Sequence, residues 1–200
     1  HTYGGDKAIN AYGYLGGSTN SVSNARQLIS NQGVVSAETT GAGSARYNCA
    51  ASAYGTGGTG IFYNGRNSGG TSIAVSNLTS NTGVVSSDVS AVGQPRNYLA
   101  GAQYGVDTAI FAFGEISGAH KTINLVSNQG VIASNTTSSN SVTSRYGLSA
   151  CRFGGDKSIF CYANSQQTMS NIISNQGVMA SDVSGVGTGR IYGGALSYSL

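Results

Sequence analysis

The string S-N-[Q/T]-G-V occurs four times in this chain, at residues 30–34, 80–84, 127–131 and 174–178. An aromatic residue recurs in step with it, at Tyr3, Tyr54, Tyr104, Phe153 and Tyr198, which are separated by 51, 50, 49 and 45 residues. Self-similarity at such a period is typical of repeat proteins. The spacing predicts one domain over residues 1–200, built from units at approximately 3–53, 54–103, 104–152 and 153–198.

Composition narrows the fold and the class of partner. Only 8% of the residues are charged, and the ten basic residues are spread along the chain, which argues against a nucleic-acid interface. The chain contains 31 glycines and one proline, as expected for a turn-rich β protein. No apolar run approaches the roughly twenty residues of a membrane-spanning helix, so we expect no membrane span.

Each unit is predicted to contain four antiparallel strands. The first strand follows an arginine and consists mostly of small residues: RYNCAASAY (46–54), RNYLAGAQY (96–104), RYGLSACRF (145–153) and RIYGGALSY (190–198). Small side chains suit strands that crowd round a common axis. The second strand follows a glycine turn (AINAYGY, IFYNG, AIFAFGE, SIFCYAN), and the S-N-[Q/T]-G turn joins the third strand to the fourth.

The segment 190–198 is a surplus first strand. If it completed the unit that begins at Tyr3, it would close a ring and leave no exposed inner edge. We therefore expect an all-β propeller of four four-stranded blades, closed by the C-terminal strand. The alternative is a window of a longer array, with repeats continuing beyond both ends.

The unit resembles a kelch blade, as in kelch-repeat proteins and the propeller domain of galactose oxidase. The resemblance rests on the arginines before the first strands, the apolar second strand ending near glycine (IFAFG), and the N-[Q/T]-G turn. The chain departs from that pattern in lacking the usual glycine pair and in having valine where tryptophan opens the fourth strand. The spellings YGGDKAIN and NLVSNQGVI are also similar to repeat proteins of bacteriophages and environmental bacteria. The kelch resemblance implies a fold, and it implies little about function because this superfamily hosts enzymes, adaptors and adhesins.

The most regular polar feature is a repeated arginine with an acid before it. An acid lies eight residues before three of the arginines: Glu38 before Arg46, Asp88 before Arg96 and Asp182 before Arg190. The remaining copy has Asn135 ten residues before Arg145. Such pairs are expected to clamp the blades together. The alternative is that four equivalent arginines face one anionic ligand.

Aromatic residues at the ends of the second strands form a second candidate site. We identify Tyr12, Tyr63, Phe113 and Tyr162 as equivalent, with Asn64 and Asn164 beside them. Aromatic faces and amide groups are what carbohydrate sites use. The competing interpretation is that these rings pack between blades.

No pattern in the chain predicts catalysis. Only His1 and His120 supply imidazoles, and metalloprotease, hydrolase and CXXC motifs are missing. We expect no cofactor and no metal site; a copper-dependent oxidase using His1 is a remote alternative. Cys151 and Cys161 lie on two arms of one hairpin and would face each other if Phe153 paired with Ile159.

These observations predict a non-enzymatic structural or adhesive module of a virion or an extracellular assembly. Expected partners are protein subunits of a larger assembly, other copies of the chain, or surface glycans. The main alternative is a lectin with repeated shallow sites. We expect the chain to work outside the cell or on a virion surface.

Overall fold

The fold is all-β in the part of the chain described by the structure, a computed structural model that covers residues 1–17 and 21–197. These residues form four antiparallel sheets, one 3-10 turn at Asn164–Gln166 and no α-helix. None of the described residues forms a helix long and apolar enough to cross a membrane.

Strands pair in sequence order within each sheet, and the second, third and fourth sheets begin at Ala50, Ala100 and Ser149, a few residues before the predicted units do. The first sheet contains β1 (Thr2–Tyr3), β2 (Lys7–Gly16), β3 (Ser21–Ile29) and β4 (Thr39–Thr40). The second contains β5 (Ala50–Tyr54), β6 (Thr59–Tyr63), β7 (Val75–Thr79) and β8 (Val89–Ser90). The third contains β9 (Ala100–Tyr104), β10 (Thr108–Ala112), β11 (Thr122–Val126) and β12 (Thr136–Thr137). The fourth contains β13 (Ser149–Phe153), β14 (Lys157–Ala163) and β15 (Gln167–Ile173).

The first and fourth strands of the sheets are shorter than the sequence pattern predicts. The arginines lie in loops before β5, β9 and β13 instead of inside those strands. The fourth strands β4, β8 and β12 contain two residues each, and in the fourth sheet the strand is reduced to one bridge between Ser170 and Val183. The valine after each S-N-[Q/T]-G turn is exposed at Val34, Val84, Val131 and Val178, so these positions gain little burial from continued pairing.

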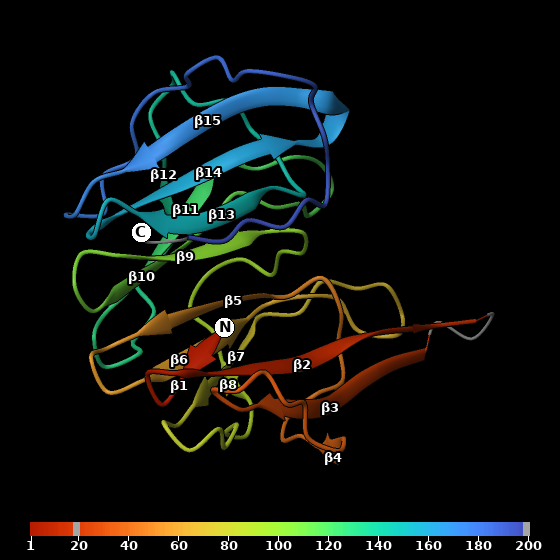
Figure 1. The fold of residues 1–200 in the computed structure, drawn as a ribbon. Helices are drawn as coiled ribbons and strands as arrows, with labels where there is room; N and C mark the ends of the chain where they lie inside the picture. Colours follow the sequence, from red (N-terminus) through yellow and green to blue (C-terminus); the bar gives the residue numbers. More distant parts are fainter. Residues whose placement is uncertain (18–20, 198–200) are drawn as a thin grey trace.

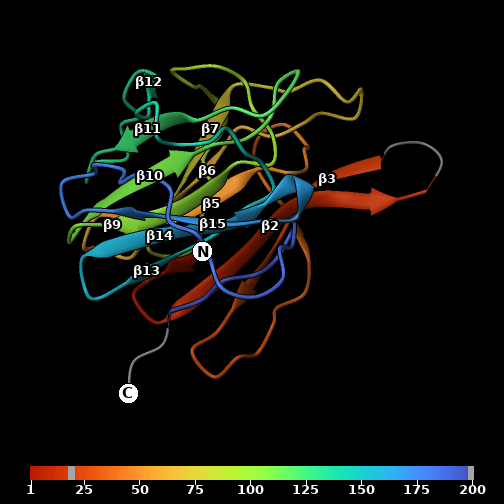
Figure 2. The same ribbon diagram turned by 90° about the horizontal axis from the view of Figure 1, so that it is seen from above.

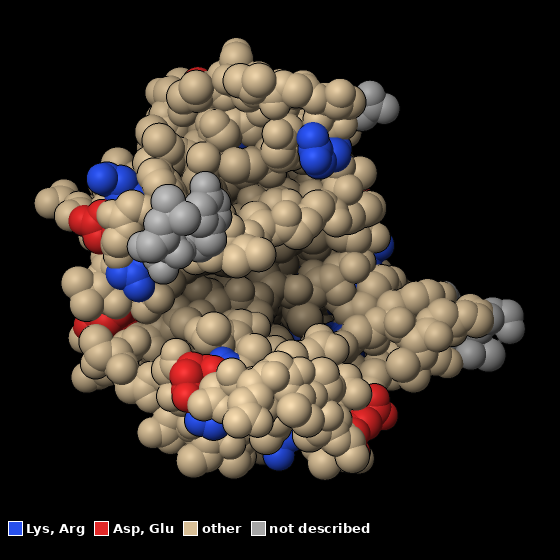
Figure 3. Space-filling model, viewed as in Figure 1, with Lys and Arg blue, Asp and Glu red and all other residues tan. Residues whose placement is uncertain are grey.

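The sheets follow one another in sequence order, with β1–β4 at the bottom of Figure 1 and β13–β15 at the top. Contacts between sheets join β1 to β5 and β6, β5 to β9, and β9 to β13. The first strands pack closely, since a Cβ on Gly101 would lie 3.0 Å from the Ala51 carbonyl oxygen. The prediction that small residues mark crowded first strands is therefore confirmed at this contact. The space-filling view is hollowed between the lower and upper sheets (Figure 3).

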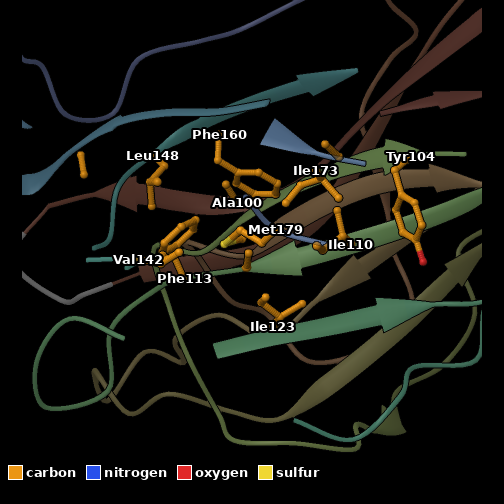
Figure 4. Close-up of a cluster of buried hydrophobic side chains, with 13 residues drawn as sticks. Ala100, Tyr104, Ile110, Phe113, Ile123, Val142, Leu148, Phe160, Ile173 and Met179 are labelled. Atoms are coloured by element: carbon orange, nitrogen blue, oxygen red, sulfur yellow. The ribbon is translucent and has the colours of Figure 1, made fainter. Parts of the chain in front are cut away.

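Three hydrophobic clusters fill the spaces between consecutive sheets. One contains Tyr12 of the first sheet and Phe62 of the second. The next joins Tyr63 to Phe111 of the third sheet. The largest joins residues of the third and fourth sheets, including Phe113 and Phe160 (Figure 4). The core is therefore divided among the interfaces between neighbouring units, as in other repeat proteins.

The surplus segment does not complete the first sheet in this structure. Residues 190–197 form no strand, and Tyr198 lies outside the described residues. The segment lies beside the fourth sheet, where the Tyr192 amide donates to the Gly147 carbonyl (2.9 Å) and the Ser149 hydroxyl donates to the Gly193 carbonyl (2.6 Å). The place of the first strand in the first sheet is held by β1, which pairs with β2. No hydrogen bond joins the first and fourth sheets among the described residues.

The first sheet has the longest hairpin of the four. Strands β2 and β3 contain 10 and 9 residues, and they extend well beyond the neighbouring sheets (Figure 2). The tip at residues 18–20 is not described.

Candidate functional site

Three arginines are fully buried between consecutive sheets. The side chains of Arg46, Arg96 and Arg145 have 0% exposure. Each precedes the first strand of its sheet, and its carbonyl accepts a hydrogen bond of 2.9 to 3.0 Å from the sheet before, donated by Gly13, Gly65 and Gly114. Each buried guanidinium is therefore placed by backbone contacts at a boundary between two units.

Each guanidinium donates to a buried asparagine on the third strand of its own sheet. Arg46 Nη2 lies 2.7 Å from Asn77 Oδ1, and Arg96 Nη2 lies 2.5 Å from Asn124 Oδ1. Arg145 makes the same contact with Asn171. Burial of a charged group requires such partners, because an unpaired buried charge is strongly unfavourable.

The acidic partner lies eleven residues after that asparagine. Arg46 Nη1 is 3.7 Å from Asp88 Oδ1, and Arg145 Nη1 is 3.2 Å from Asp182 Oδ1. The prediction of arginine and carboxylate pairs holds for these two sites, but the acid is not the one eight residues before the arginine. Arg46 and Arg145 therefore each pair with an acid that comes later in the chain, beside the last strand or bridge of the same sheet.

The same carboxylates fix the loop that carries the arginine. Asp88 Oδ2 accepts from the Ser44 amide (2.8 Å), and Asp182 Oδ2 accepts from the Thr143 amide (2.8 Å). Burial alone would raise the pKa of these carboxyls, but the hydrogen bonds outweigh it and hold the pKa of both below the usual value. We call the arginine, the asparagine and the residue eleven positions later an arginine clamp.

The third sheet carries a clamp without a carboxylate. Asn135 takes the place of the acid and accepts from Asn124 (2.9 Å). Burial lowers the pKa of Arg96 to about 10, and its Nη1 and Nε atoms have no hydrogen-bond partner among the described residues. The Arg96 clamp is therefore the least compensated of the three.

An aromatic ring of the preceding sheet covers two of these guanidinium groups. Arg46 Cζ lies 3.8 Å from the ring centroid of Tyr12, and Arg145 Cζ lies 4.6 Å from that of Phe113. Exposed Arg190 stacks in the same way on Tyr162, at 4.9 Å. Cation–π contacts of this kind each contribute about 0.5–2 kcal/mol.

In the second sheet the position equivalent to Tyr12 and Phe113 is occupied by Asn64 instead of Tyr63. The backbone φ is positive at Tyr12, Asn64, Phe113 and Tyr162, which marks these four as equivalent, whereas Tyr63 lies one residue earlier. Tyr63 nevertheless makes the equivalent hydrogen bond. Its hydroxyl donates to the Val92 carbonyl, four residues before Arg96, as the Tyr12 hydroxyl donates to the Ala42 carbonyl, four residues before Arg46.

The residues predicted to bind a ligand lie mostly between sheets. Tyr63, Phe113 and Asn64 are fully buried, and Tyr12 is 9% exposed. Asn64 donates to the Gln94 carbonyl, and Asn164 accepts from the Tyr146 amide. Tyr162 is half-buried. The rings of Tyr63 and Phe113 therefore present no face to a sugar in this conformation.

A tyrosine cluster that the sequence did not predict is formed by the segments before β9 and β13 and by residues 190–197. The ring of Tyr98 lies 5.8 Å from Tyr146 and 5.1 Å from Tyr192, centroid to centroid. Tyr192 is 60% exposed, and desolvation together with Tyr98 raises its pKa to about 12. Tyr98 and Tyr192 both lie two residues after an arginine and both have positive φ, and that shared spacing was the available signal.

The cysteine register differs from the expected one. Phe153 pairs with Lys157, so Cys151 lies opposite Ile159 and Cys161 opposite Ser149. The two thiols are diagonal neighbours, and both are free. The expectation that they face each other directly is wrong by two residues, because the turn between the strands is shorter than we expected.

The described residues contain no group of three or more His, Cys, Asp or Glu side chains that could hold a metal ion. The His1 ring contacts Phe62 at 4.9 Å and lies 3.2 Å from the Thr79 hydroxyl. No protein-family model matches this chain, and no curated protein matches it.

Proposed function

We propose that this chain is a non-enzymatic structural or adhesive module of an extracellular or virion assembly, built from kelch-like blades. The observation that carries the proposal is the arginine clamp. Its side-chain hydrogen bonds are made within one sheet, and the backbone carbonyl of each arginine accepts from the sheet before. The guanidinium groups of Arg46, Arg96 and Arg145 are buried and offer no donor to a ligand. A repeated motif whose polar groups are used in this way stabilises the fold.

The surface supports the same role. Charged residues are few and scattered (Figure 3), and the exposed loops are rich in serine, asparagine and glycine. Such a surface suits contact with other subunits more than electrostatic capture of a nucleic acid.

The proposal is tested by locating the protein in its source. Antibodies raised against the chain should label virions or extracellular structures in immuno-electron microscopy. Purified particles or matrix should contain the chain in many copies by quantitative mass spectrometry. Label confined to the cell interior, with no enrichment in any assembly, would refute the proposal.

Carbohydrate binding is a second candidate function, favoured by the tyrosine cluster of Tyr98, Tyr146 and Tyr192. Three rings within 5.8 Å of a neighbour, with Tyr192 largely exposed, present an apolar face to a sugar. The phenol groups and nearby Glu115, which contributes to the raised pKa of Tyr192, supply hydrogen-bond partners for sugar hydroxyls.

A glycan array followed by calorimetry tests this candidate. Tyr192→Ala should abolish binding of any glycan retained by the array, because it removes the most exposed ring. Tyr14→Ala is the matched control, since Tyr14 is 48% exposed and lies outside the cluster. Binding lost equally in both variants, or no binding at all, would count against a lectin.

A further inference from the structure

An incomplete arginine clamp lies on the first sheet. Strand register places Gln27 opposite Asn10, as Asn77 is opposite Phe62 and Asn171 opposite Phe160, so Gln27 holds the position of the clamp asparagine. Glu38 follows eleven residues later, where Asp88 and Asp182 stand in the other sheets. The first sheet therefore carries the acceptor half of a clamp.

A cavity takes the place of the missing arginine. It has a volume of about 180 Å³ and is lined by Tyr12, Gly13, Gln27 and Glu38 among others. Gly13 corresponds to Gly65 in the second sheet, where an added Cβ would lie 3.3 Å from Cδ of Arg46. Glu38 is exposed and makes no hydrogen bond or ion pair with any other described residue. We call this cavity the open clamp site.

The donor half of a clamp lies at the opposite end of the chain. Arg190 stacks on Tyr162 as Arg46 stacks on Tyr12. It is held in register, because the amide of Tyr192 donates to Gly147 as the Gly147 amide donates to Tyr98. Arg190 is exposed, and no carboxylate lies within ion-pair distance of it among the described residues.

A backbone hydrogen bond between hairpin turns is also left unformed on the first sheet and on the fourth. Within the chain, each turn donates to the next one, from Gly4 to Gly58, Gly55 to Asp107 and Gly105 to Asp156, at 2.6 to 2.7 Å. The equivalent donor, the Gly154 amide, has no such partner among the described residues. The equivalent acceptor, the Asp6 carbonyl, receives no such bond among them either.

A close packing contact repeats this pattern. A Cβ on Gly83, Gly130 or Gly177 would meet the aromatic ring of the preceding unit, at Tyr3, Tyr54 or Tyr104, within 3.1 Å. Gly33 faces open space, and Phe153 is half-buried whereas Tyr3, Tyr54 and Tyr104 are buried. Three independent contacts therefore leave complementary halves on the first and fourth sheets.

We propose that the fourth sheet of one copy docks head-to-tail on the first sheet of a second copy, with Arg190 entering the open clamp site against Gln27 and Glu38. The second copy is the favoured occupant because the interface repeats, contact for contact, the one that joins consecutive sheets within the chain. Opposite charges on Arg190 and Glu38 complement each other. A head-to-tail interface of this kind generates either rings or filaments.

Docking of a second copy rests on the proposed structural role, but it can be tested with the purified chain, independently of where the protein is found. Sedimentation velocity over a range of protein concentrations should show association of the 200-residue chain. Glu38→Arg and Arg190→Glu should each weaken association at least tenfold, because like charges then meet at the interface. Lys121→Glu is the matched control for charge reversal and should associate as the unmodified chain does.

Mixing the two reversed variants provides the decisive experiment. An equimolar mixture of Glu38→Arg and Arg190→Glu should associate again, since each interface then joins opposite charges. Both positions are exposed, so far-UV circular dichroism and thermal melting should report unchanged folding. A chain that stays monomeric at every concentration would overturn the inference. Assembly that survives either single reversal, or a mixture that fails to associate, would do the same.

Discussion

The arginine clamp of the third sheet lacks the carboxylate that the other two contain, so replacing Asn135 by aspartate should stabilise the protein. Arg96 is fully buried, and its Nη1 and Nε atoms have no hydrogen-bond partner in the described part of the chain. In the fourth sheet the corresponding Nη1 of Arg145 lies 3.2 Å from Asp182. Asn135→Asp places a negative charge in the third clamp, at the position equivalent to that of Asp182 in the fourth sheet.

The expected gain follows from the environment of the pair. A hydrogen bond to a charged group contributes about 1.5–3 kcal/mol to stability. The Asp182 side chain is 16% exposed, so solvent screens it in part and the lower end of that range applies. Asn135→Asp should therefore raise the free energy of unfolding by about 1.5 kcal/mol, which corresponds to about 3–6 °C in Tm for a chain of this size.

Urea denaturation at neutral pH, followed by far-UV circular dichroism, measures this change. Asp182→Asn is the reciprocal variant and should lose a similar free energy, because it converts the fourth clamp to the composition of the third. Asn140→Asp, at an exposed position outside the clamps, should have little effect. The clamp account would be refuted if Asn135→Asp destabilised the protein while Asp182→Asn left it unchanged.

Three further predictions concern pH, glycine and tyrosine. The lowered pKa of Asp88 and Asp182 gives stability that is fully present above the unfolded value of about 3.9 and is lost as pH falls through the folded values. The double variant Asp88→Asn, Asp182→Asn should therefore show a weaker dependence of the urea midpoint on pH between about pH 2 and 5 than the unmodified chain. Gly130→Ala should cost about 1–3 kcal/mol more in urea denaturation than Gly33→Ala, since both have positive φ but only at Gly130 would the new Cβ meet a tyrosine ring, 2.8 Å away; equal losses would exclude the ring contact as the cause. Spectrophotometric titration should lose one phenol that ionises near pH 12 in Tyr192→Phe, and an unaltered titration curve would contradict the cluster geometry.

The repeat and its turns could be predicted from the sequence because their causes are local. Serine and glycine in S-N-[Q/T]-G-V act within five residues: the Gly33 amide donates to the Ser30 carbonyl, and Gly33 adopts a φ of +76°. The second and third strands were also located within a few residues, since their apolar alternation is a property of short segments. The first and fourth strands were predicted too long, because pairing at the edges depends on neighbours that the local pattern does not specify.

The composition of the candidate site was predicted, but its pairing was not. Arg46 and Asp88 were both identified, yet Glu38 is much closer to Arg46 in sequence than Asp88 is. Arg46 reaches Asp88 because the loop before β5 and the loop after β7 meet at the same end of the second sheet. Sequence distance carried no information about that meeting.

The sequence by itself determined the β class, the number of units and the positions of their turns, because glycine, serine and alternating apolar residues act on the backbone nearby. Tertiary structure alone decided that Arg46 is buried against Asp88 and Arg145 against Asp182. It also decided that the first and fourth sheets remain open, because burial and partner choice depend on how whole sheets stack. Two halves of one clamp, Glu38 and Arg190, are left at opposite ends of that stack.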